Sequence, residues 1–511
     1  MKRGQKWLFA QVLLAGLLVG AAFGQQEQPP GTLAELQERL AGWISQPRFA
    51  AAQWGVKVVS LDSAKTLFEH NAGKLFSPAS NAKLYTVALA LDRLGPDYRI
   101  RTSLYAKARP DARGTLEGDL IVYGRGDPTI NARLHGGDIL KALAPLAAAL
   151  TNAGVKRIAG DLVGDASFFR GPEFGSGWEW DDQEYFYGAE ISPLTINDNT
   201  LQAGVRPGER AGVPCRLTLW PATAYLALSN RTETVPKGGR RSVSWYRLPN
   251  ENVLYASGQV PLEDPGFTEK VTMHNPAGLF IAFFQEALAR QGISVGGQLR
   301  TLNWLDRQVN PLDCAQMVEL GALESQPLRD LAREVLKSSQ NLYADLLLAH
   351  VGEKQRAADT PSSRTSEELG IRELNQFLAQ AGLKRGEVFL EEGSGLSRDN
   401  LTTPNATVTL LGFMRRHPTA EIFLQALPIA GVDGTLKDRM KDTPAAGNVR
   451  AKTGSLRWAN SLSGYVTTAA GERLAFCLML NRYHNPDPNQ SARADLDALA
   501  VMLAGLAAKS E

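Results

Sequence analysis

The chain of 511 residues is 44% hydrophobic and 21% charged, a balance that lets it bury a sizeable core in two or three domains. Its 55 Lys and Arg residues against 53 Asp and Glu residues give a formal net charge of +2, so no strong field steers the protein towards nucleic acid. The six histidines form no HxH, HExxH or Cys/His cluster, so a metal site has no support, and we expect no cofactor.

The N-terminus has the pattern of a secretory leader. Three basic residues come before an apolar run from Trp7 to Phe23, and small residues stand just ahead of Gln25. This pattern predicts a signal peptide over residues 1–24. A retained membrane anchor is the alternative, although the run is marginal for spanning a bilayer. No other uncharged run has spanning length, so we expect the mature protein to be soluble after export.

The first elements after the leader are a helix and two strands. Leu33 to Ile44 has helical spacing, while Trp54 to Leu61 and Thr66 to His70 resemble paired strands. The next stretch, Phe76 to Gly95, changes from a polar run to an apolar repeat with helical spacing. We therefore expect an amphipathic helix that begins at Ser80.

A Ser-x-x-Lys pair, Ser80 and Lys83, occupies this expected helix start. Residues three apart lie on one helix face, so the lysine amine can reach the serine hydroxyl, and the helix N-terminus favours a developing alkoxide. A lysine can activate a serine nucleophile when burial or a neighbouring cation keeps the amine partly neutral near pH 7. Taken alone, the pattern is a weak match that is better explained by a helix cap followed by a solvated lysine.

Shifts of pattern near Arg99 and Glu324 divide the chain. They predict one domain made of residues 25–98 and 320–511, around an inserted mixed α/β region of residues 99–319 that forms two smaller lobes. Within the insertion, two stretches have helical spacing: Ile139 to Ala153 and Phe280 to Arg290.

The insertion also contains an aromatic stretch, Gly177 to Thr200, that is dense in Trp, Tyr, Asp and Asn. It fits either an aromatic mini-core with turns or a wall that faces a ligand.

The three cysteines allow at most one internal disulfide, and the strand-like surroundings of Cys477 favour a buried apolar role.

The last third of the chain predicts helices followed by strands. Leu328 to His350 fits two helical pieces that meet at Ser338 to Asn341, and Ser366 to Ala381 fits an amphipathic helix. Three strands and a final helix come next, at Val449 to Leu456, Ser461 to Thr467, Leu474 to Leu480 and Ala492 to Ala508. We expect the two ends of the chain to build one sheet.

Two further motifs accompany the Ser-x-x-Lys pair, namely Ser339-Gln340-Asn341 and Lys452-Thr453-Gly454. Comparable Ser-Asp-Asn and Lys-Thr-Gly motifs stand beside Ser-x-x-Lys in penicillin-binding proteins and class A β-lactamases, and each pattern occurs once here. If the three motifs converge, Ser80 attacks a carbonyl, Lys83 takes its proton and Ser339 relays a proton towards the leaving amine.

The remaining motif residues suit a peptide that ends in a free carboxylate. The Asn341 amide would hold the substrate backbone, and Lys452 would attract the carboxylate while depressing the pKa of the first lysine. Thr453 can hydrogen-bond the same carboxylate, and Gly454 lets the substrate approach the strand. The backbone N–H groups of Ser80 and Ser455 would form the oxyanion hole.

With these residues in place, the chain resembles the class C low-molecular-mass penicillin-binding proteins, the D-alanyl-D-alanine carboxypeptidases/endopeptidases. The gap of 259 residues between Ser80 and Ser339 matches the long insertion of that family. Further segments are similar to the family over nearly the whole mature chain: GDLIVYGRGDPT, GDLVGDASFF, GWEWDD, SPLTINDNT, SSQNLYAD, GSGLSRDN and LPIAGVDGTLKDRM. The central Gln340 departs slightly from the more usual Ser-Asp-Asn.

The resemblance implies an α/β (α+β) fold: a β-lactamase/transpeptidase-like domain with a five-stranded antiparallel sheet flanked by helices, carrying the mixed α/β insertion. It also implies a periplasmic or cell-wall enzyme that removes the terminal D-Ala from peptidoglycan stem peptides, cuts peptide cross-links and is acylated at Ser80 by β-lactams. Asp181 and Arg398 occupy positions similar to residues that, in related enzymes, hold the distal end of a diaminopimelate side chain.

Two other functions remain open from sequence. A class A β-lactamase uses a glutamate in a Glu-x-x-Leu-Asn segment for deacylation, but Ile371 stands at that acid position in the similar segment Ile371 to Asn375. A non-catalytic protein that binds penicillin or peptidoglycan is the second alternative, and the intact Ser80, Lys83 and Lys452 argue against it. The balance of carboxypeptidase and endopeptidase activity and the oligomeric state stay open.

Overall fold

The structure of the protein is a computed structural model that describes residues 29–485, 487 and 491–510. The predicted signal peptide lies outside these residues. No helix within them combines the length and the apolar character that crossing a bilayer requires.

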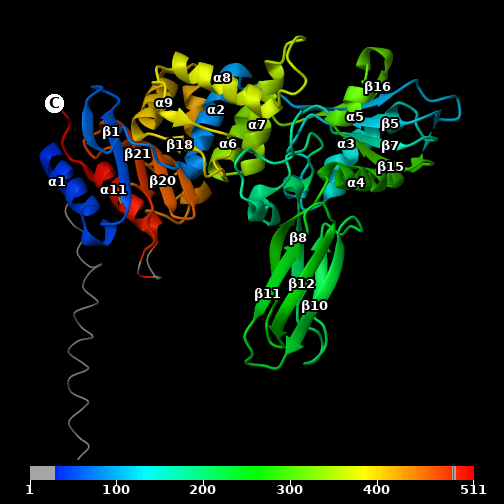
Figure 1. The fold of residues 1–511 in the computed structure, drawn as a ribbon, viewed down its shortest axis with the longest axis horizontal. Coiled ribbons are helices and arrows are strands. Elements are labelled where there is room, and N and C mark those ends of the chain that lie inside the picture. Colours follow the sequence, from blue (N-terminus) through cyan, green and yellow to red (C-terminus); the bar gives the residue numbers. More distant parts are fainter. Residues whose placement is uncertain (1–28, 486, 488–490, 511) are drawn as a thin grey trace, which may run out of the picture.

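A five-stranded sheet joins the two ends of the chain, as predicted (Figure 1). Its order is β19-β20-β21-β1-β2, and every neighbouring pair is antiparallel. The expected fold class is thereby confirmed. The strands span Gln53–Ser60 (β1), Thr66–His70 (β2), Arg450–Leu456 (β19), Ala459–Thr467 (β20) and Arg473–Asn481 (β21).

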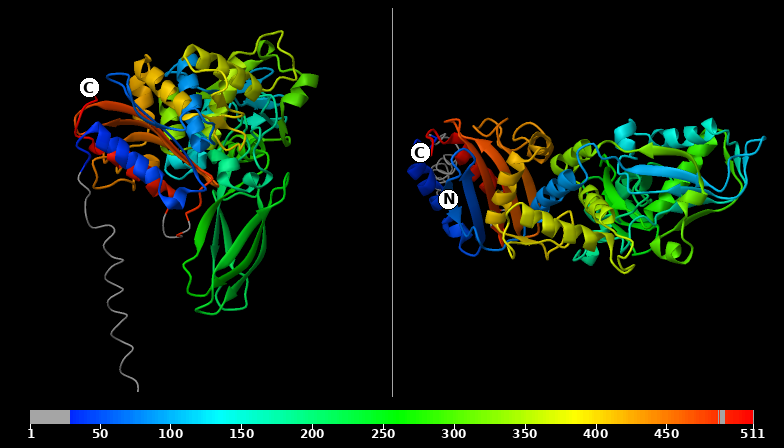
Figure 2. Two further views of the ribbon diagram at one scale, coloured as in Figure 1. Left: turned by 60° about the vertical axis from the view of Figure 1, so that its left-hand side comes forward. Right: turned by 90° about the horizontal axis from the view of Figure 1, so that it is seen from above.

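Both faces of this sheet are buried. Alternate residues of β21 belong to different cores, because successive side chains of a strand point to opposite faces. Phe476 and Leu478 pack with α1 (Leu33–Ile44) and α11 (Ala492–Gly505), whereas Cys477 packs towards α9 (Pro404–Arg416). Figure 2 shows α1 and α11 together on the outer face. The cysteine is fully buried, as predicted, and all three cysteines are free thiols.

The helix that follows Ser80 lies at the centre of the helical layer. Ser80 itself occupies a single 3-10 turn, η2 (Ala79–Asn81), and the α-helix α2 spans Ala82–Arg93, so the predicted helix start at Ser80 is two residues early. The expected amphipathic character is also wrong, because every residue from Ala82 to Leu91 is buried. The polar positions that the pattern assigned to solvent face the reaction centre and the neighbouring helices instead.

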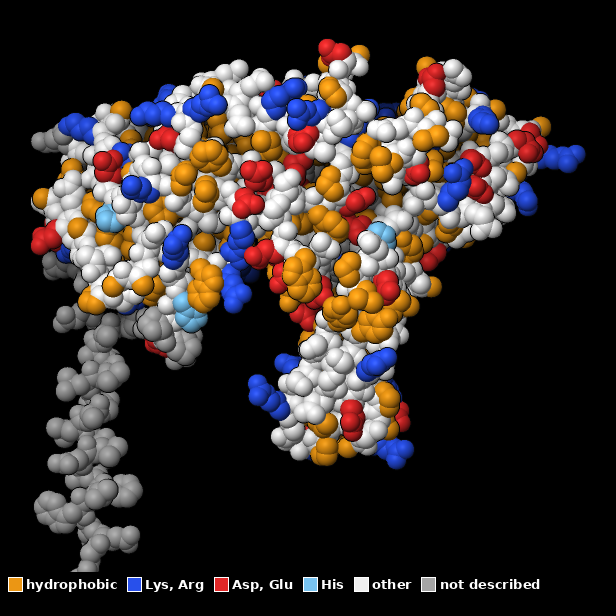
Figure 3. Space-filling model, viewed as in Figure 1, with side chains coloured by type: hydrophobic (Ala, Val, Ile, Leu, Met, Phe, Trp, Pro, Cys, Tyr) orange, Lys and Arg blue, Asp and Glu red, His pale blue; other side chains and the backbone are white. Residues whose placement is uncertain are grey.

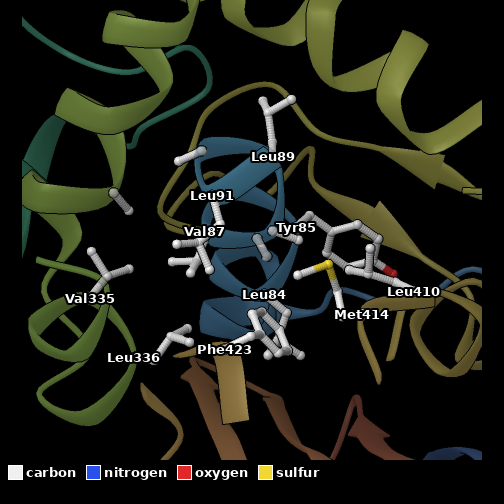
Figure 4. Packing of buried hydrophobic residues seen from close by; sticks show 14 of the residues in the cluster. Leu84, Tyr85, Val87, Leu89, Leu91, Val335, Leu336, Leu410, Met414 and Phe423 are labelled. Atoms are coloured by element: carbon white, nitrogen blue, oxygen red, sulfur yellow. The ribbon is translucent and has the colours of Figure 1, made fainter. Parts of the chain in front are cut away.

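Helices from several parts of the chain surround α2 (Figure 4). Val335, Leu336, Leu410, Met414 and Phe423 contact the same cluster as Leu84 and Val87. The surrounding elements are α6 (Leu328–Lys337), α7 (Asn341–Lys354), α8 (Ser366–Gln380), α9 and α10 (Ala420–Ala426), with the short strands β17 (Val388–Phe389) and β18 (Leu401–Thr402) nearby. This packing fixes the end of α2 that carries the nucleophile.

Residues between α2 and α6 build two further groups of sheets, which Figures 1 and 2 show at the other end of the molecule. The first is a five-stranded mixed sheet in the order β15-β7-β5-β3-β16, with α3 and α4 sharing its core. The elements are β3 (Arg101–Ala106), β5 (Leu120–Tyr123), β7 (Leu162–Asp165), β15 (Leu299–Leu302), β16 (Val318–Glu324), α3 (Ile139–Asn152) and α4 (Pro276–Arg290). A small sheet, β14-β6-β4, and the short helix α5 accompany it, at Thr115–Leu116 (β4), Arg157–Ile158 (β6), Ser294–Val295 (β14) and Trp304–Val309 (α5).

The second group projects away from the rest of the molecule in Figure 1. It contains two three-stranded sheets, β13-β8-β9 and β10-β12-β11, which enclose a small core around Val205, Cys215 and Val260. The strands span Thr200–Arg206 (β8), Arg216–Trp220 (β9), Ala227–Val235 (β10), Ser242–Arg247 (β11), Val253–Pro261 (β12) and Phe267–Thr272 (β13).

Candidate active site

The turn that carries Ser80 is held tightly against strands β19 and β20. The Ser461 hydroxyl donates to the Pro78 carbonyl over 2.6 Å, and the Asn81 amide donates to the Ser463 hydroxyl over 2.7 Å. A Cβ atom on Gly454 would lie 2.1 Å from the Ser461 hydroxyl and 2.6 Å from the Pro78 oxygen. The glycine is therefore required because the turn itself packs there, and the expected approach of a substrate at this position stays a prediction.

The backbone before Ser80 is strained. Ala79 has a φ of +48°, a left-handed conformation that costs free energy for a residue with a side chain. Gly395 packs on the same turn, since a Cβ atom on it would lie 2.1 Å from the Ala79 oxygen. The fold thus fixes the Ser80 hydroxyl in position from two sides.

Lys83 connects the first two motifs. Its Nζ atom donates to the Ser80 hydroxyl over 2.9 Å and to the Asn341 side-chain oxygen over 2.6 Å. A third bond, of 2.5 Å, goes to the Ser394 carbonyl. The Asn341 amide nitrogen in turn donates to the Tyr187 carbonyl over 2.8 Å. The amine is therefore placed to receive the serine proton.

Burial sets the protonation of this amine. Lys83 is fully buried, and the loss of solvation lowers its pKa from 10.5 to about 8. The carboxylates of Glu392 and Asp345 act in the opposite direction. About a tenth of the amine is therefore neutral at pH 7, enough to act as a general base.

The second serine is paired with the second lysine. Lys452 Nζ donates to the Ser339 hydroxyl over 2.8 Å and to the Thr453 carbonyl over 2.7 Å. Ser339 has a φ of +59°, so its backbone is also in the left-handed region. It stands in the junction between α6 and α7 that the sequence predicted.

Burial and neighbouring cations both act on Lys452. Burial lowers the pKa of Lys452 well below 10.5, and the nearby Lys83 and Arg439 lower it further. Repulsion between two cations is reciprocal, so the expected lowering of the Lys83 pKa by Lys452 stays a prediction. At Lys83 two carboxylates act against such a lowering, whereas no carboxylate is among the groups that shift the pKa of Lys452.

Strand β19 carries the rest of the third motif. The Thr453 hydroxyl donates to the Thr435 hydroxyl over 2.8 Å, and the exposed Ser455 donates to the Asn460 side chain over 3.1 Å. The strand pairs with β20 along its whole length, with Lys452 opposite Ser463. The three motifs therefore lie together, around two linked serine–lysine pairs.

Known proteins show the same combination of sequence and fold. The profile of the D-Ala-D-Ala carboxypeptidase 3 (S13) family matches residues 36–503. The chain belongs to this family. The predicted relation to the class C low-molecular-mass penicillin-binding proteins is thereby confirmed, and the protein is a serine-type D-Ala-D-Ala carboxypeptidase.

Individual relatives of this S13 enzyme agree. It is 32% identical over 507 residues to a D-alanyl-D-alanine carboxypeptidase of Actinomadura sp. (strain R39), covering 96% of this chain and 88% of the relative. It is 28% identical over 447 residues to D-alanyl-D-alanine carboxypeptidase DacB of Haemophilus influenzae, covering 86% and 87%. A crystal structure of penicillin-binding protein 4 (dacB) from Haemophilus influenzae superposes with a TM-score of 0.76, at 25% identity, covering 92% of this chain and 97% of the other.

Of the two residues expected to hold the far end of the substrate, Arg398 contacts the start of the segment that carries the other, Asp181. Arg398 approaches the 3-10 turn η4 (Trp180–Glu184), which contains Asp181, but its contact there is with Glu179. The Arg398 Nε atom lies 3.7 Å from the Glu179 carboxylate. Asp181 is exposed, whereas the neighbouring Asp182 accepts the Glu179 backbone N–H over 2.9 Å.

The segment similar to a β-lactamase deacylation motif is part of α8, as predicted. Its glutamate, Glu373, pairs with Arg93 at 2.6 Å and belongs to the helical layer.

Among residues 29–485, 487 and 491–510, no three His, Cys, Asp or Glu side chains are grouped so that they could hold a metal ion.

The sequence did not point to Glu392 and Asp345, the two buried carboxyl groups near Lys83. Glu392 is fully buried and accepts from the backbone of Ser394 over 2.9 Å, from the backbone of Gly395 over 2.7 Å and from Asn400 over 2.5 Å. Asp345 accepts from the Gly393 backbone over 2.8 Å, and burial raises its pKa well above 3.8. A glutamate directly before a Gly-Ser-Gly turn was the available signal, because turn N–H groups need an acceptor.

Proposed function

We propose that this S13 enzyme removes the terminal D-Ala from peptidoglycan stem peptides through an acyl-enzyme at Ser80. The observation that carries the proposal is the pair of serine–lysine contacts, 2.9 Å at Ser80 and 2.8 Å at Ser339, together with the bond from Lys83 to Asn341, two residues after Ser339. One pair is placed to activate a nucleophile, and the other is placed to return a proton.

The reaction follows from these contacts. The Ser80 Oγ atom attacks the carbonyl carbon of the penultimate residue while Lys83 takes the hydroxyl proton. When the C–N bond breaks, Ser339 gives its proton to the leaving amine and Lys452 replaces it. Water then hydrolyses the ester and regenerates the serine. The backbone N–H groups of Ser80 and Ser455 are proposed to hold the oxyanion.

The substrate is proposed to enter with its free carboxylate towards β19. Lys452 and Thr453 would bind that carboxylate, and the Asn341 amide would hold the peptide backbone. Asp181 and Arg398 are proposed to bind the far end of the diamino acid side chain, since both lie by η4. We further propose that residues 25–98 and 320–511 form the catalytic domain around an insertion of residues 99–319.

Two further proposals concern the setting of the reaction. A β-lactam presents a reactive carbonyl and a carboxylate in one ring system, so we expect it to acylate Ser80. A structure of penicillin-binding protein 4 from Haemophilus influenzae carries a β-lactam in complex, at 24% identity to this chain. The leader pattern and the nature of the substrate support export to the periplasm or cell wall.

Labelling with a fluorescent penicillin, followed by mass mapping, tests the proposal. We expect the adduct on Ser80 and release of free D-Ala from a diacetylated tripeptide. Ser339→Ala should slow D-Ala release, whereas the exposed neighbour Ser338→Ala is the matched control and should not. An adduct elsewhere, or turnover that survives Ser80→Ala, would refute the assignment. Separation of purified muropeptides after incubation measures the balance of carboxypeptidase and endopeptidase activity.

A further inference from the structure

Arg398 contacts two segments that each continue into a tryptophan. Its Nε atom lies 3.7 Å from the Glu179 carboxylate, and its Nη1 atom donates to the Arg457 carbonyl over 2.8 Å. The residue after each of these partners is a tryptophan. Trp180 is 75% exposed and Trp458 is 47% exposed, although tryptophan usually buries most of its surface.

The backbone at Trp458 is strained, which indicates that the exposure of this ring serves a function. Arg457 and Trp458 form the two-residue turn between β19 and β20, and Trp458 has a φ of +67°. Glycine or asparagine is usual at such a position, because a bulky side chain strains the left-handed conformation. The ring contacts the exposed His484 ring at 5.1 Å and the Arg457 guanidinium at 5.5 Å, and Trp458 stays 47% exposed. Strain of this kind is typical of binding positions.

The second tryptophan belongs to a larger exposed aromatic surface. Tyr185 and Phe186 follow Trp180 and are 48% and 53% exposed. Tyr185 stacks on Tyr187 with an interplanar angle of 9°, so the exposed Tyr185 ring is supported by a second aromatic ring. Figure 3 shows a hollow between the part with the five-stranded sheet and the projecting sheets, with hydrophobic, basic and acidic side chains along its edges.

Both tryptophans lie on chain segments that lead to the reaction centre. Strand β19 carries Lys452 and ends at Leu456, two residues before Trp458. On the other side, the Asn341 amide donates to the Tyr187 carbonyl over 2.8 Å. Each exposed tryptophan therefore belongs to a segment that also contacts or carries a residue of the reaction centre.

We propose that Trp180 and Trp458 form a rim that binds the glycan strand to which the stem peptide is attached. The inference rests on the proposed function and adds a polymer of amino sugars to its substrate. A sugar ring has an apolar C–H face that packs on an aromatic ring, and its hydroxyl and amide groups need hydrogen-bonding neighbours. Glu179, Arg398 and Arg457 provide charged groups next to the rings. This mixture suits a neutral sugar chain better than an apolar protein surface.

The test compares substrates with and without sugar. Trp180→Ala, Trp458→Ala and the double variant are assayed for kcat/KM on a diacetylated tripeptide and on glycan-linked pentapeptide chains. We expect activity on the free tripeptide to change less than about twofold, and activity on the glycan-linked substrate to fall about two- to tenfold per tryptophan through KM. Tyr246→Ala, which removes a 46% exposed ring on β11, is the matched control and should leave both unchanged.

A direct binding measurement accompanies the kinetics. An oligomer of β-1,4-linked N-acetylglucosamine should inhibit cleavage of the glycan-linked substrate and lose affinity in the double variant. Trp180→Phe and Trp458→Phe, which retain a ring, should preserve most of the activity. Equal losses on both substrates, or no loss on either, would overturn the inference. A wild-type enzyme that releases no D-Ala from the free tripeptide would instead contradict the proposed function, so the two failures are distinguishable.

Discussion

Substituting Gly454 by alanine should separate the position of the nucleophile from its chemistry. The added Cβ would lie 2.6 Å from the Pro78 oxygen and 2.1 Å from the Ser461 hydroxyl, whereas Cβ atoms essentially never come within 3.0 Å of another heavy atom. The Pro78 oxygen must therefore retreat by at least 0.4 Å and the hydroxyl by at least 0.9 Å. The hydroxyl can rotate only by leaving its 2.6 Å bond to that oxygen, at a cost of about 1 kcal/mol.

The displaced turn carries Ser80, so activity should fall more than stability. We expect a loss of about 1–3 kcal/mol in the free energy of unfolding. The second-order rate of Ser80 acylation by a chromogenic β-lactam should fall about tenfold to a hundredfold, as expected for a misplacement approaching 1 Å. Urea denaturation and stopped-flow acylation measure the two quantities.

Gly42→Ala is the matched control for this substitution. Gly42 lies within α1, and a Cβ atom there would meet nothing within 4 Å. It should leave acylation unchanged and stabilise the helix by up to about 1 kcal/mol. Folded Gly454→Ala protein that acylates within threefold of the wild-type rate would refute the reasoning about the turn.

Three further predictions concern charges in and around the site. Because burial lowers the pKa of Lys83 to about 8, the acylation rate should rise about tenfold per pH unit below pH 7 and level off above about pH 8. An acylation rate that does not change between pH 6 and 9 would exclude Lys83 as the base. Glu392→Gln removes an anion that raises the pKa of Lys83, so the inflection of the acylation pH profile should move to lower pH. The free energy of unfolding should also fall by about 2–4 kcal/mol. The exposed Glu391→Gln is the control, and an inflection that moves to higher pH would contradict the prediction. Asp181→Asn should raise KM for a diaminopimelate-containing peptide and leave a diacetylated lysine peptide unaffected, and an equal effect on both would remove Asp181 from side-chain recognition.

Local patterns predicted most of the sheet that supports the site. The bounds of α1 agree with the expected helix, and the three C-terminal strands differ from their predicted limits by one or two residues. These segments have strong helical or two-residue periodicity, and their burial on one or two faces follows directly from it. By contrast, α9, which covers the inner face of the sheet, was not expected from the sequence. The buried residues of α9, among them Thr407, Leu411 and Met414, recur with helical spacing, so the signal was present in the sequence and was missed.

The pattern around Ser80 misled for a physical reason. Thr86 looks like a solvent position on an amphipathic helix, but its hydroxyl donates to the Gly393 carbonyl over 2.7 Å and is buried. Lys83 likewise bonds a backbone carbonyl, that of Ser394. A backbone carbonyl has no residue type, so a sequence pattern cannot identify it as a partner. The motif side chains could be named from sequence, whereas the backbone groups that position them could not.

The two lysines have opposite surroundings, and this difference orders the proposed reaction. Lys83 has Glu392 and Asp345 nearby, which favour its proton, whereas Lys452 has only cationic neighbours among the groups that shift its pKa. Before substrate binds, the proton is therefore held more firmly on Lys83. A substrate carboxylate beside Lys452 would favour the charged form of Lys452. The charged Lys452 would then repel the proton on Lys83 and lower the pKa of Lys83, which reverses the balance. On this argument the carboxylate of the correct substrate is what frees the base, and a peptide capped as an amide should lose acylation rate as well as affinity.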